Sequence, residues 1–125
     1  MISIDYKIEK TLHEQISQRF KDLIICGVLN PGDQLPSVRE LSVDLTVNPN
    51  TVQRAYKSLE TEGVIYSVRG KGNFVADSHE IDNRALEKLY QTLSETVREL
   101  AFYGETPEKI SEVVTNLFKE RNDDK

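Results

Sequence analysis

The chain has 125 residues, of which 38% are hydrophobic and 30% are charged, with a net charge of −5. Such a composition is typical of a folded chain and excludes disorder along its whole length, and the length suits one modest domain with an appendage. No apolar run is long enough to span a membrane, and the N-terminus lacks the basic and apolar regions of a signal peptide, so we expect a cytoplasmic protein. The single cysteine, Cys26, excludes an internal disulfide framework and a cysteine-rich zinc site, and its apolar neighbours predict a small buried side chain.

The negative charge lies in one part of the chain. Residues 1–76 contain nine Lys or Arg and nine Asp or Glu, whereas residues 77–125 contain seven and twelve. A segment without net charge can still present a basic face, because binding to a polyanion depends on the local field. The overall charge therefore does not exclude a nucleic-acid partner for the first segment.

Two helices are predicted at the start of the chain. Thr11 and Glu14 have the spacing of a capping box, apolar residues follow at helical spacing, and Gly27 suits the left-handed position after a helix. Ser37 and Glu40 form a second capping box, which opens a short helix after a turn rich in Pro and Gly.

A third helix is predicted to begin after Asn48, which suits the N-cap, with Pro49 at the first helical position. It should run to Glu62, with Gly63 as its stop. Successive residues turn by about 100° in a helix, so the apolar residues fall on one side and polar ones on the other. The polar set comprises Asn50, Arg54, Lys57 and Thr61, with Gln53 at its edge.

A short hairpin follows the third helix. The residues 64–68 and 73–75 have the composition of β-strands, and Arg69, Gly70, Lys71 and Gly72 would join them as a tight basic tip. The order of three helices and a hairpin predicts a winged helix-turn-helix, a mainly α fold with a small β-hairpin.

The remaining residues predict a separate helical region. We place the winged helix-turn-helix domain, which we expect to bind DNA, at residues 1–76, a polar linker at 77–81 and a helical dimerisation region at 82–125. The first of its apolar stripes ends at Gly104, and Thr106 with Pro107 opens the last helix. Two helices cannot bury both stripes on each other, so the stripes either pack on the first domain or pair with a second copy of the chain.

The third helix and the hairpin tip carry the residues with the most informative chemistry. Side chains on the first two turns of a helix can reach base edges in a major groove. Arg54 could bind guanine with two hydrogen bonds, and Asn50 and Gln53 could pair with adenine; the alternative is an ordinary solvated face. The glycines of the tip would let the backbone approach DNA while Arg69 and Lys71 neutralise phosphate; the alternative is a plain hairpin turn.

Four segments, residues 36–41, 48–56, 59–65 and 69–75, resemble the GntR family of bacterial transcription regulators. The likeness runs from about residue 11 to residue 75, over half the chain. In that family the arginine of a Ser-x-Arg element, the first turns of the third helix and the glycine-containing tip contact DNA. For Arg39, the matching arginine, an ion pair with Glu40 or Asp44 is the alternative. The resemblance implies a DNA-binding set of Arg39, Asn50, Thr51, Arg54, Arg69, Gly70 and Lys71, and Gln53 joins it by helix geometry.

The resemblance also implies an assembly. The segment from Asp77 to Lys125 has only 49 residues, too few for the large effector domains of other branches of the family. A tail of two helices is similar to that of the YtrA-type subfamily. Members of the family act as dimers, so we expect a homodimer that binds an inverted-repeat operator. The predicted interface consists of Leu86, Leu89, Leu93, Val97, Leu100, Val113 and Leu117.

An enzyme is not predicted, and neither a cofactor nor a metal is expected. His13 and His79 stand in separate elements without the spacing of a metal site, and no nucleophile and base form a recognisable pair. Two alternatives are a winged helix that binds protein, which the basic tip disfavours, and a small-molecule sensor, which the apolar stripes disfavour. The expected function is a sequence-specific DNA-binding transcription regulator; we predict a repressor, although the residues do not separate repression from activation.

Overall fold

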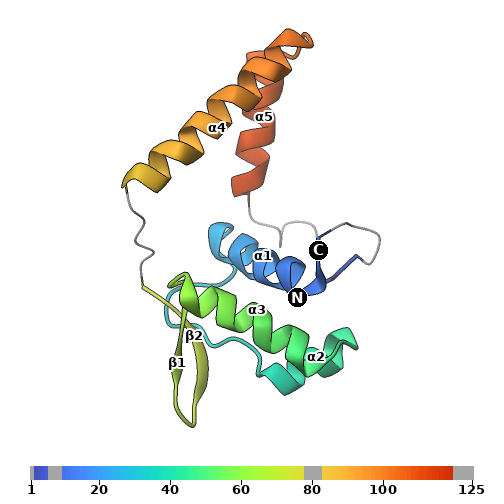
Figure 1. The fold of residues 1–125 in the computed structure, drawn as a ribbon, viewed down its shortest axis with the longest axis vertical. Coiled ribbons are helices and arrows are strands. Elements are labelled where there is room, and N and C mark those ends of the chain that lie inside the picture. The colour runs from blue at the N-terminus through green and yellow to red at the C-terminus, as the bar shows by residue number, and fades with distance from the viewer. Residues whose placement is uncertain (1, 6–9, 78–82, 120–125) are drawn as a thin grey trace. The chain divides into compact units, whose positions relative to one another are not determined.

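The computed structural model describes residues 2–5, 10–77 and 83–119, which form two compact units, one on each side of residues 78–82. The first unit contains α1 (Leu12–Ile25), α2 (Val38–Leu45), α3 (Pro49–Thr61), β1 (Ile65–Val68) and β2 (Gly72–Val75), and the second contains α4 (Asn83–Phe102) and α5 (Pro107–Phe118) (Figure 1). The predicted mainly α fold with a small β-hairpin is confirmed. Apart from Asp77, the predicted linker lies outside the described residues, as do residues 82 and 120–125 of the predicted helical region.

Side-chain caps begin α1 and α2, as the sequence predicts. Thr11 and Ser37 each accept a hydrogen bond from the amide three residues later, and the carboxylates of Glu14 and Glu40 accept from the amides of the caps. The Thr11 hydroxyl, and then its amide, hold the pKa of Glu14 below its ordinary value. For Glu40 the Ser37 amide, and then its hydroxyl, lower the pKa in the same way. Both caps therefore work best with ionised carboxylates.

The turn between α2 and α3 depends on a residue in the left-handed region. Thr46 ends α2 with φ at +55°, and its amide donates to the carbonyls of Ser42 and Val43. Asn48 then caps α3, because its side chain accepts from the amide of Asn50 at 2.8 Å. The chain reverses within a few residues, which places α3 against α2 as in a helix-turn-helix.

The core of the first unit lies between α1, α3 and the hairpin. Phe20 and Tyr56 pack edge to face with ring centroids 5.6 Å apart, and the Tyr56 hydroxyl donates to the Pro36 carbonyl at 2.7 Å. Burial, and then the negative charge of Glu40, raise the pKa of Tyr56, so the phenol keeps its proton. Cys26 is buried, as predicted. The largest fully buried side chains are Phe20, Ile16, Leu59, Ile65, Val52 and Val75.

The residues before α2, which the sequence predicted only as a turn, lie beside the hairpin as a third extended segment. β1 and β2 pair antiparallel, and the residues 33–35 run along the free side of β2. The Leu35 amide donates to the Asn73 carbonyl and the Val75 amide to the Asp33 carbonyl, each at 2.9 Å. The hairpin is thereby attached to the loop that precedes α2.

Three element boundaries differ from the prediction by one residue. The Val64 amide donates to the Leu59 carbonyl at 2.9 Å, so Val64 belongs to the turn that closes α3. Gly72 pairs with Val68 and so belongs to the hairpin ladder. The helix ends at Thr61 rather than Glu62, the first strand starts at Ile65 rather than Val64, and the second starts at Gly72 rather than Asn73.

The second unit is a helical hairpin of α4 and α5 (Figure 1). Gly104, with φ at +88°, reverses the chain after α4, and the Glu105 amide donates to the Leu100 carbonyl at 3.0 Å. Thr106 caps α5 by accepting from the Lys109 amide at 3.1 Å. Neither helix contains a buried residue. Among the described helices, none is long and apolar enough to cross a membrane.

Candidate nucleic-acid interface

The outer side of α3 carries the polar residues that the sequence singled out. Asn50, Gln53 and Arg54 are exposed, while Thr51 is half-buried at the start of the helix. The opposite side of α3 is buried against α1, α2 and β1. The helix therefore presents a polar face that is held rigidly by the core beneath it.

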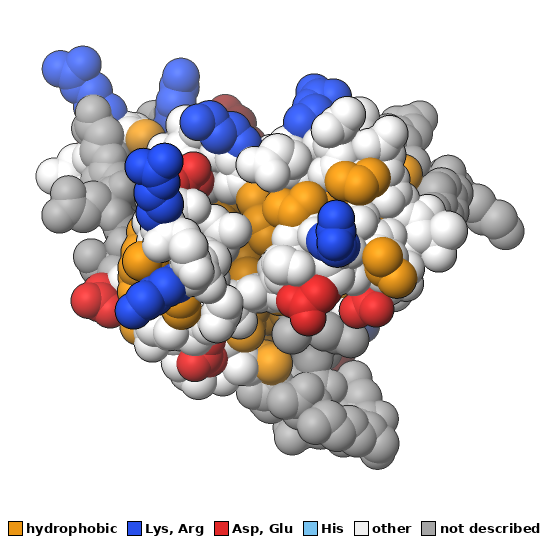
Figure 2. All heavy atoms as spheres, turned by 90° about the horizontal axis from the view of Figure 1, so that it is seen from below, with side chains coloured by type: hydrophobic (Ala, Val, Ile, Leu, Met, Phe, Trp, Pro, Cys, Tyr) orange, Lys and Arg blue, Asp and Glu red, His pale blue; other side chains and the backbone are white. Residues whose placement is uncertain are grey.

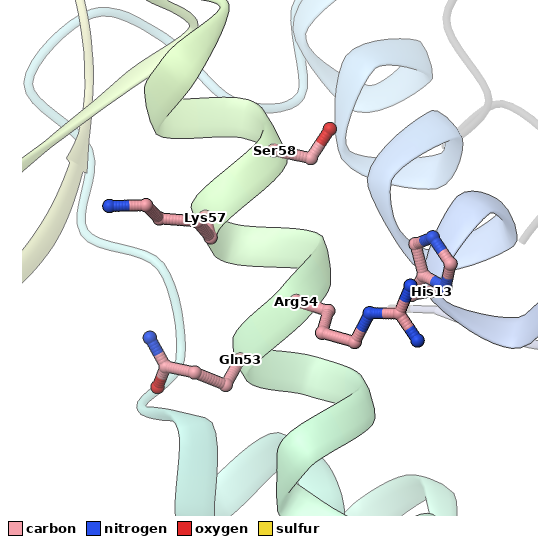
Figure 3. A pocket seen from close by; sticks show the side chains of 5 residues that line it. All are labelled: His13, Gln53, Arg54, Lys57 and Ser58. Atoms are coloured by element: carbon pink, nitrogen blue, oxygen red, sulfur yellow. The ribbon is translucent and has the colours of Figure 1, made fainter.

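The side chains on this face point in two directions (Figure 3). Arg54 and Ser58 project toward α1 and His13, whereas Gln53 and Lys57 project to the other side of α3. Together the five residues line an open groove of about 440 Å³. The sequence-based prediction did not include His13, Lys57 or Ser58 in the site. Lys57 had a visible signal, since it lies in the polar set of α3, but the approach of His13 depends on how α1 packs on α3.

Arg39 and the hairpin tip supply the other predicted contacts. Arg39 is exposed in the first turn of α2, and within the described residues it forms no ion pair with Glu40 or Asp44. Gly70 has φ at +77°, which favours glycine, and a Cβ there would meet only open space. Arg69 and Lys71 flank it and are exposed. The tip therefore presents an accessible backbone at Gly70 with one cationic side chain on each side of it.

A residue that the sequence did not single out holds the tip in place. Gln34 donates from Nε2 to the Lys71 carbonyl at 2.8 Å. A Cβ added at Gly72, where φ is +123°, would lie 2.7 Å from the same nitrogen. Glycine at this position therefore leaves the space in which the Gln34 side chain reaches the tip.

The cations of this face have no ion-pair partner among the residues that the structure describes. Within the described residues, the ion pairs join Arg19 to Asp22, Lys21 to Glu62, and Lys109 to Glu112. Figure 2 shows Lys and Arg side chains projecting separately from one face, mostly in the upper half of the view, with most Asp and Glu side chains in the lower half. None of those ion pairs includes the exposed cations of α2, α3 and the tip, namely Arg39, Arg54, Lys57, Arg69 and Lys71.

The segment that contains the capped polar helix and the basic hairpin matches a known protein family. The family of bacterial regulatory proteins named gntR matches residues 12–75, which include α1, α2, α3 and the hairpin. The chain belongs to the GntR family.

Relatives of this GntR-family chain extend the match beyond the domain. The transcriptional repressor YtrA of Bacillus subtilis is 35% identical over 119 residues, which cover 94% of this chain and 92% of YtrA. A crystal structure of a transcriptional antiterminator from Listeria monocytogenes EGD-e is 33% identical, with a TM-score of 0.78, and covers 94% of this chain and 92% of that one. The likeness to YtrA supports the YtrA-type branch of the family.

A solved complex bears on the partner. The DNA-binding domain of AraR bound to the operator ORX1 is 25% identical to this chain, with a TM-score of 0.55, and covers 61% of this chain and 95% of that one. The chain is a DNA-binding transcription regulator, and its relatives and fold are those of regulators rather than enzymes.

The apolar residues predicted for an interface lie in the second unit and are open to solvent. Val97 is half-buried and the others are exposed, with Leu89 at 61% and Leu117 at 58%. The predicted set omitted Phe102, the last residue of α4, and Tyr103, which follows it; both are still more exposed. The exposed large hydrophobic side chains of this unit are Leu86, Leu89, Tyr90, Leu93, Leu100, Phe102, Tyr103, Val113, Val114, Leu117 and Phe118.

Proposed function

We propose that this regulator represses transcription as a homodimer, in the cytoplasm, by binding an operator with two inverted half-sites. The observation that carries the proposal is the second unit, in which α4 and α5 contain no buried residue and display their apolar side chains. Helices that have no core of their own need a partner surface to be stable. A second copy of the same unit supplies such a surface with matching shape and chemistry.

The mode of regulation is supported by the relatives. YtrA of Bacillus subtilis, which aligns over nearly the whole of both chains, is named a repressor. A dimer with two-fold symmetry presents two copies of α3, and two-fold related helices bind two-fold related half-sites. We therefore infer repression through occupancy of an inverted repeat.

Within each half-site we assign separate tasks to the predicted contacts. Asn50 and Gln53, on the first two turns of α3, have amide side chains suited to adenine. Arg39 at the start of α2 and the tip of the hairpin suit phosphate, because they offer positive charge or free backbone outside α3, the helix that would enter the major groove. The DNA-binding set that we propose comprises Arg39, Asn50, Thr51, Gln53, Arg54, Arg69, Gly70 and Lys71.

The dimer is tested by placing charge on the apolar stripe of α4. In the proposed interface, Leu93→Asp with Val97→Asp should give monomers in sedimentation, because two carboxylates would be buried against a partner. The matched control, Gln91→Asp with Ser94→Asp, adds the same charge at polar exposed positions of the same helix and should remain dimeric. Dimers that persist in the first variant would refute this interface.

The operator is tested by selecting bound duplexes from a random pool with the full chain, followed by footprinting. We expect protection of two inverted half-sites on one face of the duplex, and protection of a single half-site by the monomeric variant. In cells, deleting the protein should raise transcription from a promoter that carries the selected site; a fall would identify an activator and refute repression.

A further inference from the structure

The groove between α1 and α3 brings a residue of α1 to the recognition surface. His13 lies in the first turn of α1, and Arg54 projects toward it from the second turn of α3 (Figure 3). Ser58, one turn beyond Arg54, lines the same side of the groove. The two basic side chains come from helices that are separate in the sequence but packed together in the core.

The acidic groups that neighbour the residues of the groove are engaged in other contacts. Glu62, which follows α3, pairs with Lys21 at 2.6 Å and accepts from the Ser58 hydroxyl at 3.2 Å, so its charge is neutralised. Near His13, the Glu14 carboxylate accepts from the amide and the hydroxyl of Thr11 at 3.0 and 2.8 Å. The nearby acidic groups are thus engaged, whereas Arg54 has no anionic partner within the described residues.

We propose that this groove holds one backbone phosphate of the bound DNA, contacted by the guanidinium of Arg54 and the imidazole of His13. The proposal rests on DNA binding through α3. A phosphate is the anion that lies beside a helix seated in the major groove, and a guanidinium matches its oxygens with two donors. Arg54 then positions the duplex, and the side chains on the other side of α3, Gln53 among them, read the bases.

The hydrogen bonds of His13 define its protonation in such a contact. The Thr11 hydroxyl donates its one hydrogen to Glu14 Oε1, so Thr11 Oγ1 accepts from His13 Nδ1, which lies 3.1 Å away. Nε2 then carries a hydrogen only in the imidazolium form, and a phosphate oxygen accepts but does not donate. The charged groups nearest the ring are Arg54, which projects toward it from α3, and Glu14, which follows it in α1. The imidazolium form of His13 can therefore donate from Nε2 to a phosphate oxygen while Nδ1 stays bonded to Thr11.

The first experiment measures affinity for the selected operator and for a random duplex between about 50 and 200 mM salt, using the full chain. Arg54→Ala should weaken binding to both duplexes by the same factor, about tenfold, as expected for one charged hydrogen-bonded contact. It should also reduce the slope of log affinity against log salt by about 0.9, the value for one phosphate. Arg54→Lys should restore the slope, because a phosphate accepts a point charge.

His13→Ala should likewise weaken both duplexes equally, and the double variant Arg54→Ala with His13→Ala should lose less than the product of the single losses, because the two residues share one phosphate. The control is Arg19→Ala, which removes one positive charge from α1 at a residue that pairs with Asp22 and does not line the groove. Arg19→Ala should alter neither affinity nor slope. Melting temperatures of all variants show whether each still folds.

The second experiment compares affinity at pH 6 and pH 8, a range in which imidazole side chains change charge. The wild-type protein should bind more tightly at the lower pH, and His13→Asn should lose most of that difference. An operator-selective loss in Arg54→Ala, or unchanged affinity and pH dependence in the His13 variants, would overturn the phosphate site. A wild-type protein that binds no duplex would instead refute DNA binding itself, so the two failures are distinguishable.

Discussion

Replacing Gly72 with alanine should destabilise the first unit through two separable effects. The first is backbone strain, because φ at +123° lies in a region that L-residues rarely adopt, at a cost of about 1–3 kcal/mol. The second is steric, because the new Cβ would lie 2.7 Å from Nε2 of Gln34. Moving that amide breaks its 2.8 Å bond to the Lys71 carbonyl, for about 0.5–1.5 kcal/mol. The total is about 1.5–4.5 kcal/mol, large enough to measure by urea unfolding.

A double-mutant cycle separates the two effects. In the background of Gln34→Ala, Gly72→Ala should cost only the strain, so the coupling free energy should be about 0.5–1.5 kcal/mol. Gly70→Ala is the control for strain at the same tip, because its Cβ would meet open space at a φ of +77°. It should show no coupling to Gln34. If Gly72→Ala costs the same with and without the Gln34 side chain, the steric reasoning is wrong.

Three further perturbations test the caps, the core and the tip. Tyr56→Phe removes the donor to the Pro36 carbonyl and should cost about 1–2 kcal/mol in urea unfolding, without a change in the unfolding slope. Folding lowers the pKa of Glu40, so its carboxylate stabilises the folded state above the unfolded pKa, and this stabilisation is lost as pH falls through the folded pKa. The free energy of unfolding of the wild type should therefore fall more steeply below about pH 5 than that of Glu40→Gln. Gly70→Val should weaken DNA binding in a gel shift while the protein remains folded, since the bulk sits at an exposed tip; unaltered affinity would reduce the tip to an ordinary turn.

The helix starts could be predicted because each depends on residues within one turn. Thr11, Ser37, Asn48 and Thr106 all cap as expected, since a hydroxyl or amide oxygen needs only the amides that follow it in the chain. The polar face of α3 followed from periodicity for the same reason. Local chemistry was therefore sufficient for the order of elements and for the exposed polar face of α3.

The features that were missed depend on contacts between distant segments or on an uncommon backbone conformation. The bond from Gln34 to Lys71 joins residues 37 apart, and no pattern in either segment indicates it. Thr46 adopts a left-handed φ, which a sequence pattern predicts only when glycine or asparagine stands at the position. The direction of Arg54 is set by the packing of α1 on α3, which brings His13 beside it (Figure 3). Periodicity places a residue on a face, but the neighbouring helix determines where a long side chain points.

A final prediction concerns why a protein with a net charge of −5 binds a polyanion. Lys71 lies at the exposed tip without an ion pair in the described residues, whereas Lys109 in α5 pairs with Glu112 at 3.1 Å. Lys71→Ala and Lys109→Ala change the net charge equally. If the local field governs binding, Lys71→Ala should weaken operator and random duplex by the same factor and lower the salt slope by about 0.9, while Lys109→Ala should change neither. Equal effects of the two variants on slope and affinity would show that total charge governs binding, and would refute the phosphate contact at the tip.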